Sequence, residues 1–450
     1  MTTAAPGSVP TAVPTIPRTP TSVLLLCLAC MTLEGYDVIA YGAALPFLLA
    51  DRAWALTVAQ AGVLGSLTPI GMLVGAVTVG LLTDRLGRRR LILVSTTVFS
   101  LAMILCGVAP GVTLFAVGRL LVGLGVGGVL PSIAALVYEY SAPGRHHLNT
   151  ALAFAGVGVG GLLAAVVAAV WGPDLGFRVV FLVGGLAALV VLPAAVRFLP
   201  ESLVHLRSRG QLDAARRWVD RLGLPPALAT ADDRATATGD AGRGRLAVLF
   251  GRGHATQTLL FCLATFASLL VLFGLYTWLP QLMRSAGYEV GSALTFLVVL
   301  NVGTAVGPLL VGRIADRVGS RPATVGSFLL AVVGIAALSQ PLPALVLYVA
   351  VVLAGVGTVG TQILINVFIA SRYPVHARAT AIGTALSVGR LGGILGPVYG
   401  GLLLAAELPI SVLFYAFAGP ALLGAVAILL VPRRTRTTGP ERVAADATAA

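Results

Sequence analysis

Two acidic residues lie close together inside the first long apolar stretch of the chain. Glu34 and Asp37 are three positions apart, which places both carboxyl groups on one face of a helix. Asp37 lies about 12 residues from the end of that stretch, or roughly 18 Å at the rise of a helix. Two close carboxylates in a poorly hydrated place cannot easily both ionise, so we expect the pair to take up and release a proton. The alternative is a fixed ion pair with an arginine of another helix.

Two arginines also lie inside apolar stretches, Arg119 within 113–139 and Arg390 within 378–405. A guanidinium stays charged, so arginine is a poor proton carrier, but its planar fork binds carboxylates well. Arg119 could switch between a carboxylate of the protein and an anionic substrate. Arg390 has no acidic residue nearby on its own helix, so it needs a distant partner, either an anionic substrate or one of the helix carboxylates. The alternatives are a snorkelling side chain or a structural salt bridge.

Three further polar or aromatic residues are candidates for contact with a substrate. Gln362 and Asn366 are four positions apart and form a short polar stripe that could hydrogen-bond a substrate hydroxyl or only a neighbouring helix. Tyr36, between the two acidic residues, could stack on an aromatic ring or pack in the core.

Charged residues at one end of several apolar stretches form a second group, in which we expect a gate. Glu139 ends the stretch that contains Arg119, about 30 Å away from it along a helix, and is expected to pair with a nearby arginine. Charge pairs at helix ends can hold one conformation and release another. The predicted gate comprises Asp84, Arg85, Arg88, Glu139, Arg145, Asp316 and Arg317.

The composition of the chain indicates that these residues lie within a membrane protein. Of its 450 residues, 57% are hydrophobic and only 10% charged, and the mean hydropathy is +0.96. Soluble domains carry about a quarter charged residues, so the composition argues against a soluble enzyme. The net charge of +13 comes from arginines in short polar gaps between apolar runs, which argues against nucleic-acid binding. The four cysteines lie in apolar runs without metal-ligand spacing.

The apolar runs divide the chain into two sets of six helices, because backbone groups in lipid must be satisfied internally. We expect a disordered tail at 1–21, one half at 22–199, a linker at 200–257, a second half at 258–432 and a disordered tail at 433–450. The twelve runs are at about 22–49, 58–82, 91–109, 113–139, 148–170, 178–199, 258–283, 291–314, 323–340, 344–370, 378–405 and 410–431.

The arginines also predict the orientation of the chain in the cell membrane. Nearly all of the 30 basic residues would share one side if both termini were cytoplasmic, and only Arg52, Arg178 and Arg284 would lie at the outer edge. Because arginine is retained on the cytoplasmic side, both termini are expected there.

An internal repeat distinguishes residues that the fold needs in both halves from charged residues that occur in one half only. The intramembrane charges are absent from the second copy, where Asp37 corresponds to Leu269 and Arg119 to Val351. Charge there is not needed for the fold and is therefore a functional hypothesis. The repeat is seen 232 residues further on, where Gly80, Asp84, Arg85, Gly87 and Arg89 recur as Gly312, Asp316, Arg317, Gly319 and Arg321.

The repeated segment 80–90 resembles the loop signature of the major facilitator superfamily, and Pro200-Glu201-Ser202 fits the same family. The resemblance covers about 22–432. It implies an all-α membrane protein with twelve transmembrane helices in two six-helix pseudo-repeats. Residues 34–37, Glu-Gly-Tyr-Asp, resemble a motif of the aromatic acid:proton symporter family, except that Glu34 stands where that family usually has Asp.

We therefore expect a proton-coupled secondary transporter that imports a small organic anion by alternating access. The resemblance narrows the anion to an aromatic acid such as a benzoate. The expected partners are this acid, protons and the lipid bilayer, with no nucleic acid, no cofactor, no metal and no covalent chemistry. We expect the chain to function as a monomer.

Three alternatives remain open from the sequence. A drug exporter is disfavoured because residues 155–161 lack the proline that exporters of the superfamily often carry in the fifth helix. A sugar carrier is disfavoured by the two intramembrane arginines. A sensor on the same fold would bind its ligand without flux.

Overall fold

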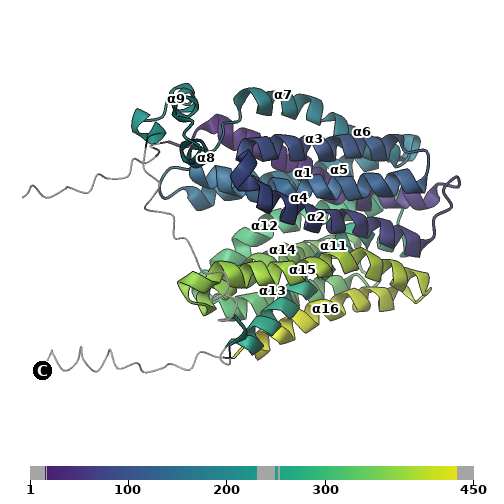
Figure 1. Cartoon of the computed structure of the whole chain (residues 1–450). Coiled ribbons are helices and arrows are strands. Elements are labelled where there is room, and N and C mark those ends of the chain that lie inside the picture. Colours follow the sequence, from purple (N-terminus) through teal and green to yellow (C-terminus); the bar gives the residue numbers. More distant parts are fainter. Residues whose placement is uncertain (1–15, 17, 231–248, 252–253, 433–450) are drawn as a thin grey trace, which may run out of the picture.

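The computed structural model describes residues 16, 18–230, 249–251 and 254–432, and all regular elements among them are helices (Figure 1). Twelve segments of this described part are long and apolar enough to span a membrane. The N-terminal half consists of α1 (Thr21–Ala50), α2 (Val58–Leu86), α3 (Arg88–Val108), α4 (Val112–Glu139), α5 (His146–Leu175), α6 (Arg178–Leu186) and α7 (Ala188–Phe198). The C-terminal half consists of α11 (Ala255–Ser285), α12 (Val290–Val318), α13 (Ser320–Ala337), α14 (Ala344–Arg372), α15 (Val375–Ala405) and α16 (Ile410–Leu430).

Helix packing follows the internal repeat. In the N-terminal half α1 packs along α5 and α2 along α4, and in the C-terminal half α11 packs along α15 and α12 along α14. The halves meet through two equivalent pairs, α2 with α15 and α5 with α12, and through α1 with α11. The predicted fold class, two six-helix pseudo-repeats in a membrane, is confirmed. The expected disordered tails lie almost wholly outside the described residues.

The sixth apolar run differs from the expected single helix. It is divided at Ala187 into α6 and α7, but Ala187 keeps helical backbone angles and its amide donates to the Val183 carbonyl over 3.0 Å, so the two form the one expected span, Arg178–Phe198. Residues 202–224 of the linker, where the sequence has helical spacing, contain α8 (Leu203–Ser208) and α9 (Leu212–Arg221), and η1 (Pro226–Ala229) follows them.

Repeated glycines mark the places where helices come closest. A Cβ on Gly160 of α5 would lie 1.9 Å from the Thr32 carbonyl oxygen of α1, and one on the equivalent Gly392 would lie 2.1 Å from the Phe266 oxygen. Real Cβ atoms do not approach so closely, so only glycine allows these contacts. These small residues thus let the backbones of the two helices approach closely.

The repeated Asp-Arg-x-Gly segments join consecutive spans by a sharp turn. Gly87, between α2 and α3, has φ +85°, and Gly319, between α12 and α13, has φ +89°. This left-handed region is accessible to glycine at little cost. The positive φ angle of the turn therefore explains why a glycine occurs at this position in both halves, independently of the role of the neighbouring charged residues.

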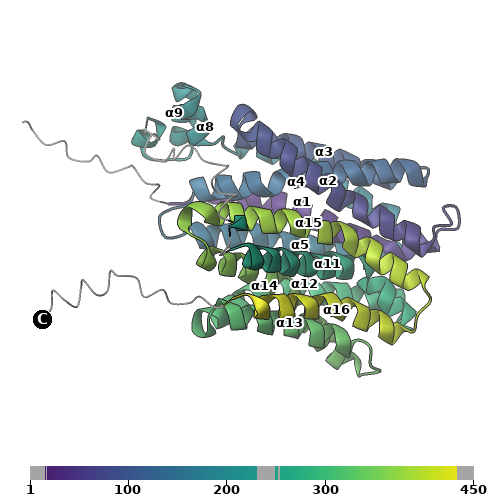
Figure 2. The same ribbon diagram turned by 60° about the horizontal axis from the view of Figure 1, so that its bottom comes forward.

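The two ends of the bundle differ in how tightly the halves meet. We call the end from which α1 starts the tail side, because both ends of the described chain lie there (Figures 1 and 2), and the opposite end the far side. On the far side the Ser66 hydroxyl donates to the Ile394 carbonyl over 2.5 Å, and the Arg284 guanidinium donates to the Pro46 carbonyl over 3.2 Å. On the tail side a cavity of about 460 Å³ lies between Arg390 of α15 and residues of α2 and α4, among them Gly80. The halves are thus closed on the far side and separated on the tail side.

Candidate functional site

Asp37 and Arg119 form a buried ion pair within the N-terminal half. Arg119 Nη1 lies 2.9 Å from Asp37 Oδ1, and the two residues are 2% and 0% exposed. The guanidinium carbon lies 5.0 Å from the centre of the Tyr41 ring and 5.6 Å from that of Phe181. Among the described residues, Asp37 Oδ2 and Arg119 Nε have no hydrogen-bond partner. The pair is therefore held by one contact, with unused polar atoms on both sides.

Glu34 lies on the same helix but faces the other half. Its side chain is 3% exposed, and Oε2 has no partner among the described residues. The carboxyl group interacts electrostatically with Asp37 and with Tyr276 of α11. The two acidic residues are thus close together but differently placed, Asp37 beside an arginine and Glu34 at the interface of the halves.

Arg390 of α15 reaches across the interface toward the N-terminal half. Its Nη1 donates to the Met72 carbonyl over 3.1 Å, and it forms no ion pair within the described part of the chain. The side chain lines a cavity of about 460 Å³ on the tail side, whose other walls come from α2, α3, α4 and α5. Arg88, Thr83 and Ser132 also line it. An anion that enters this cavity would meet the Arg390 guanidinium.

The other three residues predicted to contact the substrate lie in different helices, Gln362 and Asn366 in α14 and Tyr36 in α1. Gln362 Nε2 and Oε1 and Asn366 Oδ1 are buried in α14 with no partner among the described residues, so both side chains have unused hydrogen-bonding capacity. Tyr36 is 5% exposed, and its hydroxyl donates to the Val180 carbonyl over 2.8 Å. The structure thus gives Tyr36 a packing role within the N-terminal half and does not bring it to the cavity.

Part of the predicted gate is assembled on the tail side around Glu139. Its Oε2 lies 2.6 Å from Arg88 Nη1 and accepts the Ser202 hydroxyl over 2.7 Å, while Oε1 accepts the Val204 amide over 2.9 Å. These contacts attach the start of α8 to the ends of α3 and α4. The linker is thereby fixed to the N-terminal half.

The remaining gate residues are not joined to this cluster. Arg145, Asp316 and Arg317 are exposed and form no ion pair among the described residues. Arg85 contributes only its carbonyl, which accepts from Arg209 over 3.2 Å. The side chain of Asp84 lies outside what the structure describes. All described contacts of Glu139 thus stay within one half and the linker.

Glu201 is a tail-side residue that the sequence analysis did not include in the gate. Its Oε1 accepts the Arg89 and Ser202 amides over 3.0 and 2.9 Å, and its carbonyl accepts the Tyr140 hydroxyl over 2.7 Å. Burial, with Glu139 and Glu201 nearby, raises the pKa of Tyr140 well above its usual range, so the hydroxyl remains a donor. The segment Pro200-Glu201-Ser202 was the available signal.

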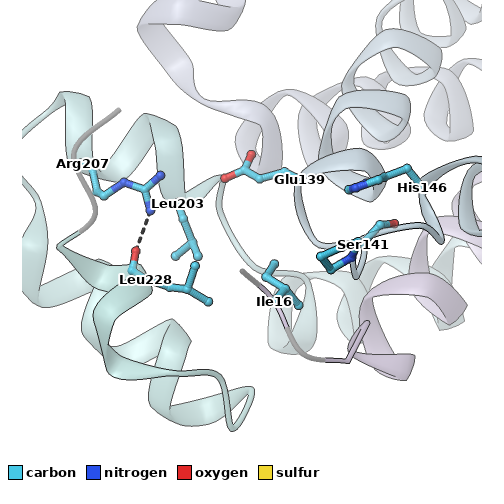
Figure 3. A pocket seen from close by; sticks show the side chains of 8 residues that line it. Ile16, Glu139, Ser141, His146, Leu203, Arg207 and Leu228 are labelled. Atoms are coloured by element: carbon cyan, nitrogen blue, oxygen red, sulfur yellow. Dashed lines mark hydrogen bonds between the residues drawn. The ribbon is translucent and has the colours of Figure 1, made fainter. Parts of the chain in front are cut away.

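The start of the described chain also packs against the linker. The Thr19 hydroxyl accepts the Ala142 amide over 3.0 Å and the Asn149 amide group over 2.8 Å. Ile16 lines a cavity of about 210 Å³ together with Glu139, His146 and Arg207, which donates to the Leu228 carbonyl (Figure 3). The tail side of the N-terminal half is thus built from three segments distant in sequence.

Solved structures of similar fold are transporters. The chain superposes on a partially occluded inward-open structure of the xylose transporter XylE from E. coli with a TM-score of 0.70 and 17% identity, over 94% of this chain and 100% of that one. It superposes on the nucleoside transporter NupG with a TM-score of 0.72 and 14% identity, over 92% and 100%. At these identities the likeness concerns the fold alone.

Relatives in sequence extend over nearly the whole chain. A benzoate transport protein of Acinetobacter baylyi is 33% identical over 92% of this chain and 89% of its own length. A gentisate transporter of Corynebacterium glutamicum is 36% identical over 90% and 86%. The sequence profile described as Major Facilitator Superfamily matches residues 27–397 and, in a second match, 261–449. With its twelve spans, its two repeated halves and these relatives, the chain belongs to the major facilitator superfamily.

Proposed function

We propose that this protein imports a small aromatic carboxylate together with a proton, by alternating access between its two halves. Relatives named for the transport of benzoate, gentisate and gallate support the substrate class. The observation that carries the mechanism is the buried pair of Asp37 and Arg119, with its unused polar atoms.

Charge balance in this pair supports coupling of the proton to the anion. Removing one partner of a buried ion pair costs about 3–5 kcal/mol. A proton on Asp37 would leave the Arg119 guanidinium without its counter-charge, and a substrate carboxylate would replace it. A carboxylate without a proton would place a second negative charge beside one guanidinium. The site therefore favours a proton and an anion together over either one alone.

Glu34 and Arg390 extend this mechanism to the interface of the halves. Glu34 interacts electrostatically with Asp37 and with Tyr276 of α11. A change in the charge of Asp37 would therefore alter the protonation of Glu34 and, through it, the interaction of α1 with α11. Arg390 would receive the substrate carboxylate on the tail side. The unused amides of Gln362 and Asn366 would hydrogen-bond ring hydroxyls or the carboxylate.

The tail side is proposed to face the cytoplasm, with both termini there. The arginine-rich polar segments between the apolar runs lie on this side, as expected for cytoplasmic loops. The described conformation, closed on the far side, would then be the one that releases substrate into the cell. The cluster of Arg88, Glu139 and Ser202 would belong to the gate on this side. One chain supplies both halves, so we propose that a monomer transports.

Uptake into proteoliposomes tests the proposal. The panel contains labelled benzoate, a labelled sugar and a cationic dye, and the lumen is alkaline relative to the outside. We expect benzoate alone to accumulate, and an uncoupler to collapse this accumulation. A pH-linked flux of the dye without benzoate uptake would instead indicate an exporter and overturn the proposal.

A further inference from the structure

Three arginines gather around two aromatic rings at the tail-side end of α7. The guanidinium carbon of Arg221 lies 5.2 Å from the centre of the Trp218 ring and 5.6 Å from that of Phe198. Arg89 lies 5.4 Å from the same Trp218 ring, and Arg197 lies 5.8 Å from that of Phe198. We call these five residues the arginine–aromatic cluster. It brings together α3, α7 and α9, which are distant in sequence.

The arginine side chains of this cluster form no ion pair among the described residues, and the nearby carboxylate of Glu201 accepts the Arg89 backbone amide instead. Arg89 donates to the Val196 carbonyl, yet its Nε is buried without a partner among the described residues. On α9 itself, Asp213 lies 3.8 Å from Arg216 instead. Like charges gathered in this way favour an anion that comes from outside the chain.

The position of the cluster defines the kind of anion. Phe198 is the last residue of the span Arg178–Phe198 and is 49% exposed, so its ring lies where the hydrocarbon region ends. Helix α9 lies beyond the end of α7 at the outer flank of the bundle (Figure 1). Its apolar face is buried through Ala215 and Val219, and its arginines remain exposed. At this level of a bilayer the available anions are lipid phosphates.

We propose that the arginine–aromatic cluster binds the headgroup of an anionic phospholipid on the tail side. The lipid phosphate would accept hydrogen bonds from Arg197 and Arg221, and its acyl chains would lie against the exposed face of α7. Trp218 and Phe198 would hold the guanidinium groups in place by cation–π contact. This site is separate from the substrate path, because none of the five residues lines the cavity that contains Arg390.

Native mass spectrometry of the purified full chain in detergent tests this site. Phosphatidylglycerol and phosphatidylcholine are titrated separately, and the Kd of the first bound lipid is measured. The wild type is expected to bind phosphatidylglycerol more tightly than phosphatidylcholine. An excess of inorganic phosphate should not displace the bound phosphatidylglycerol. The double variant Arg197→Gln/Arg221→Gln should weaken this binding roughly 25-fold, since each arginine at an anionic surface contributes a factor of about five.

Two further variants distinguish lipid binding at the cluster from general attraction of lipids by the positive charge of this surface. Arg216→Gln/Arg217→Gln removes the same charge from exposed positions of α9 outside the cluster, and should leave the Kd within about twofold. Arg197→Lys/Arg221→Lys keeps the charge without the planar fork, and should bind with intermediate affinity. Equal binding of both lipids, displacement by inorganic phosphate, or an equal loss in the two glutamine variants would each overturn the proposal. A thermal unfolding scan of each variant shows that it is folded.

Discussion

Asp37 and Arg119 are the residues on which coupling depends most in this mechanism. Asp37→Asn leaves a buried guanidinium without its counter-charge, so we expect loss of gradient-driven benzoate accumulation and a lower thermal stability, from a destabilisation of about 3–5 kcal/mol. The double variant Asp37→Asn/Arg119→Gln removes both charges and should regain most of the stability without regaining accumulation. Accumulation at the wild-type level in Asp37→Asn would show that this carboxylate is not the coupling group.

Arg390 is expected to act on substrate affinity rather than on coupling. A hydrogen bond from a charged donor contributes about 1.5–3 kcal/mol, so Arg390→Gln should raise the KM for benzoate about tenfold or more. Arg390→Lys should give a smaller increase. The matched control is Arg313→Gln, which removes the same charge from an exposed position of the C-terminal half. An unchanged KM in Arg390→Gln would place the substrate carboxylate elsewhere.

The residue types of the site could be predicted from the sequence, but their partners could not. Acidic residues three positions apart and an intramembrane arginine indicated proton and anion chemistry. That Arg119 pairs with Asp37 and not with Glu34 depends on how α4 crosses α1. The partner of Tyr36 was also beyond the sequence, because its hydrogen bond to the Val180 carbonyl depends on where α6 packs.

At the scale of elements, the close packing of α1 on α5 positions both carboxylates. A Cβ on Gly160 would lie 1.9 Å from the Thr32 oxygen and 2.4 Å from the Tyr36 nitrogen. Gly160→Ala should push α1 away, at a cost of about 1–3 kcal/mol, and reduce both thermal stability and uptake. Gly326→Ala in α13 meets open space and serves as the control. Wild-type stability and uptake in Gly160→Ala would contradict this packing.

The attachment of α8 to the N-terminal half depends on one side chain. Glu139 joins Arg88, Ser202 and Val204, so Glu139→Gln replaces a charged acceptor of three contacts by a neutral one. We expect faster hydrogen exchange across residues 203–221, measured by mass spectrometry. Glu407→Gln changes an exposed carboxyl on the far side and should leave this exchange unaltered. Unchanged protection in Glu139→Gln would show that other contacts hold the linker.

The number of helices and their division into two repeated halves were predictable because they follow from local patterns. Apolar length defines the spans, and the repeated segment 232 residues further on defines the halves. The slight irregularity at Ala187 within the sixth span was not predictable, since no proline or glycine occupies that position. The hydrogen bonds of Thr19 with Ala142 and of Glu139 with Val204 of the linker join distant segments, which no local pattern specifies.

The whole molecule has a gap between its halves on the tail side and tight contacts on the far side. Thr83 lines the tail-side cavity, whereas Ser66 is 2% exposed and bonded across the far-side interface. A cysteine introduced at Thr83 should therefore react with a membrane-impermeant maleimide added on the tail side, and one at Ser66 should resist reagent from either side. The native cysteines are buried and provide the background. Rapid labelling at Ser66 from the far side would contradict the described closure.

The proposed mechanism requires that the proton and the anion cross the membrane together, and this coupling can be measured as proton movement driven by substrate. Proteoliposomes with a pH-sensitive dye inside, without an initial pH gradient, receive an inward gradient of benzoate, and ionophores clamp the membrane potential. Acid that enters by free diffusion is subtracted with protein-free vesicles. We predict protein-dependent acidification of the lumen with the wild type, and none with Asp37→Asn. Protein-dependent benzoate entry without acidification would contradict the account.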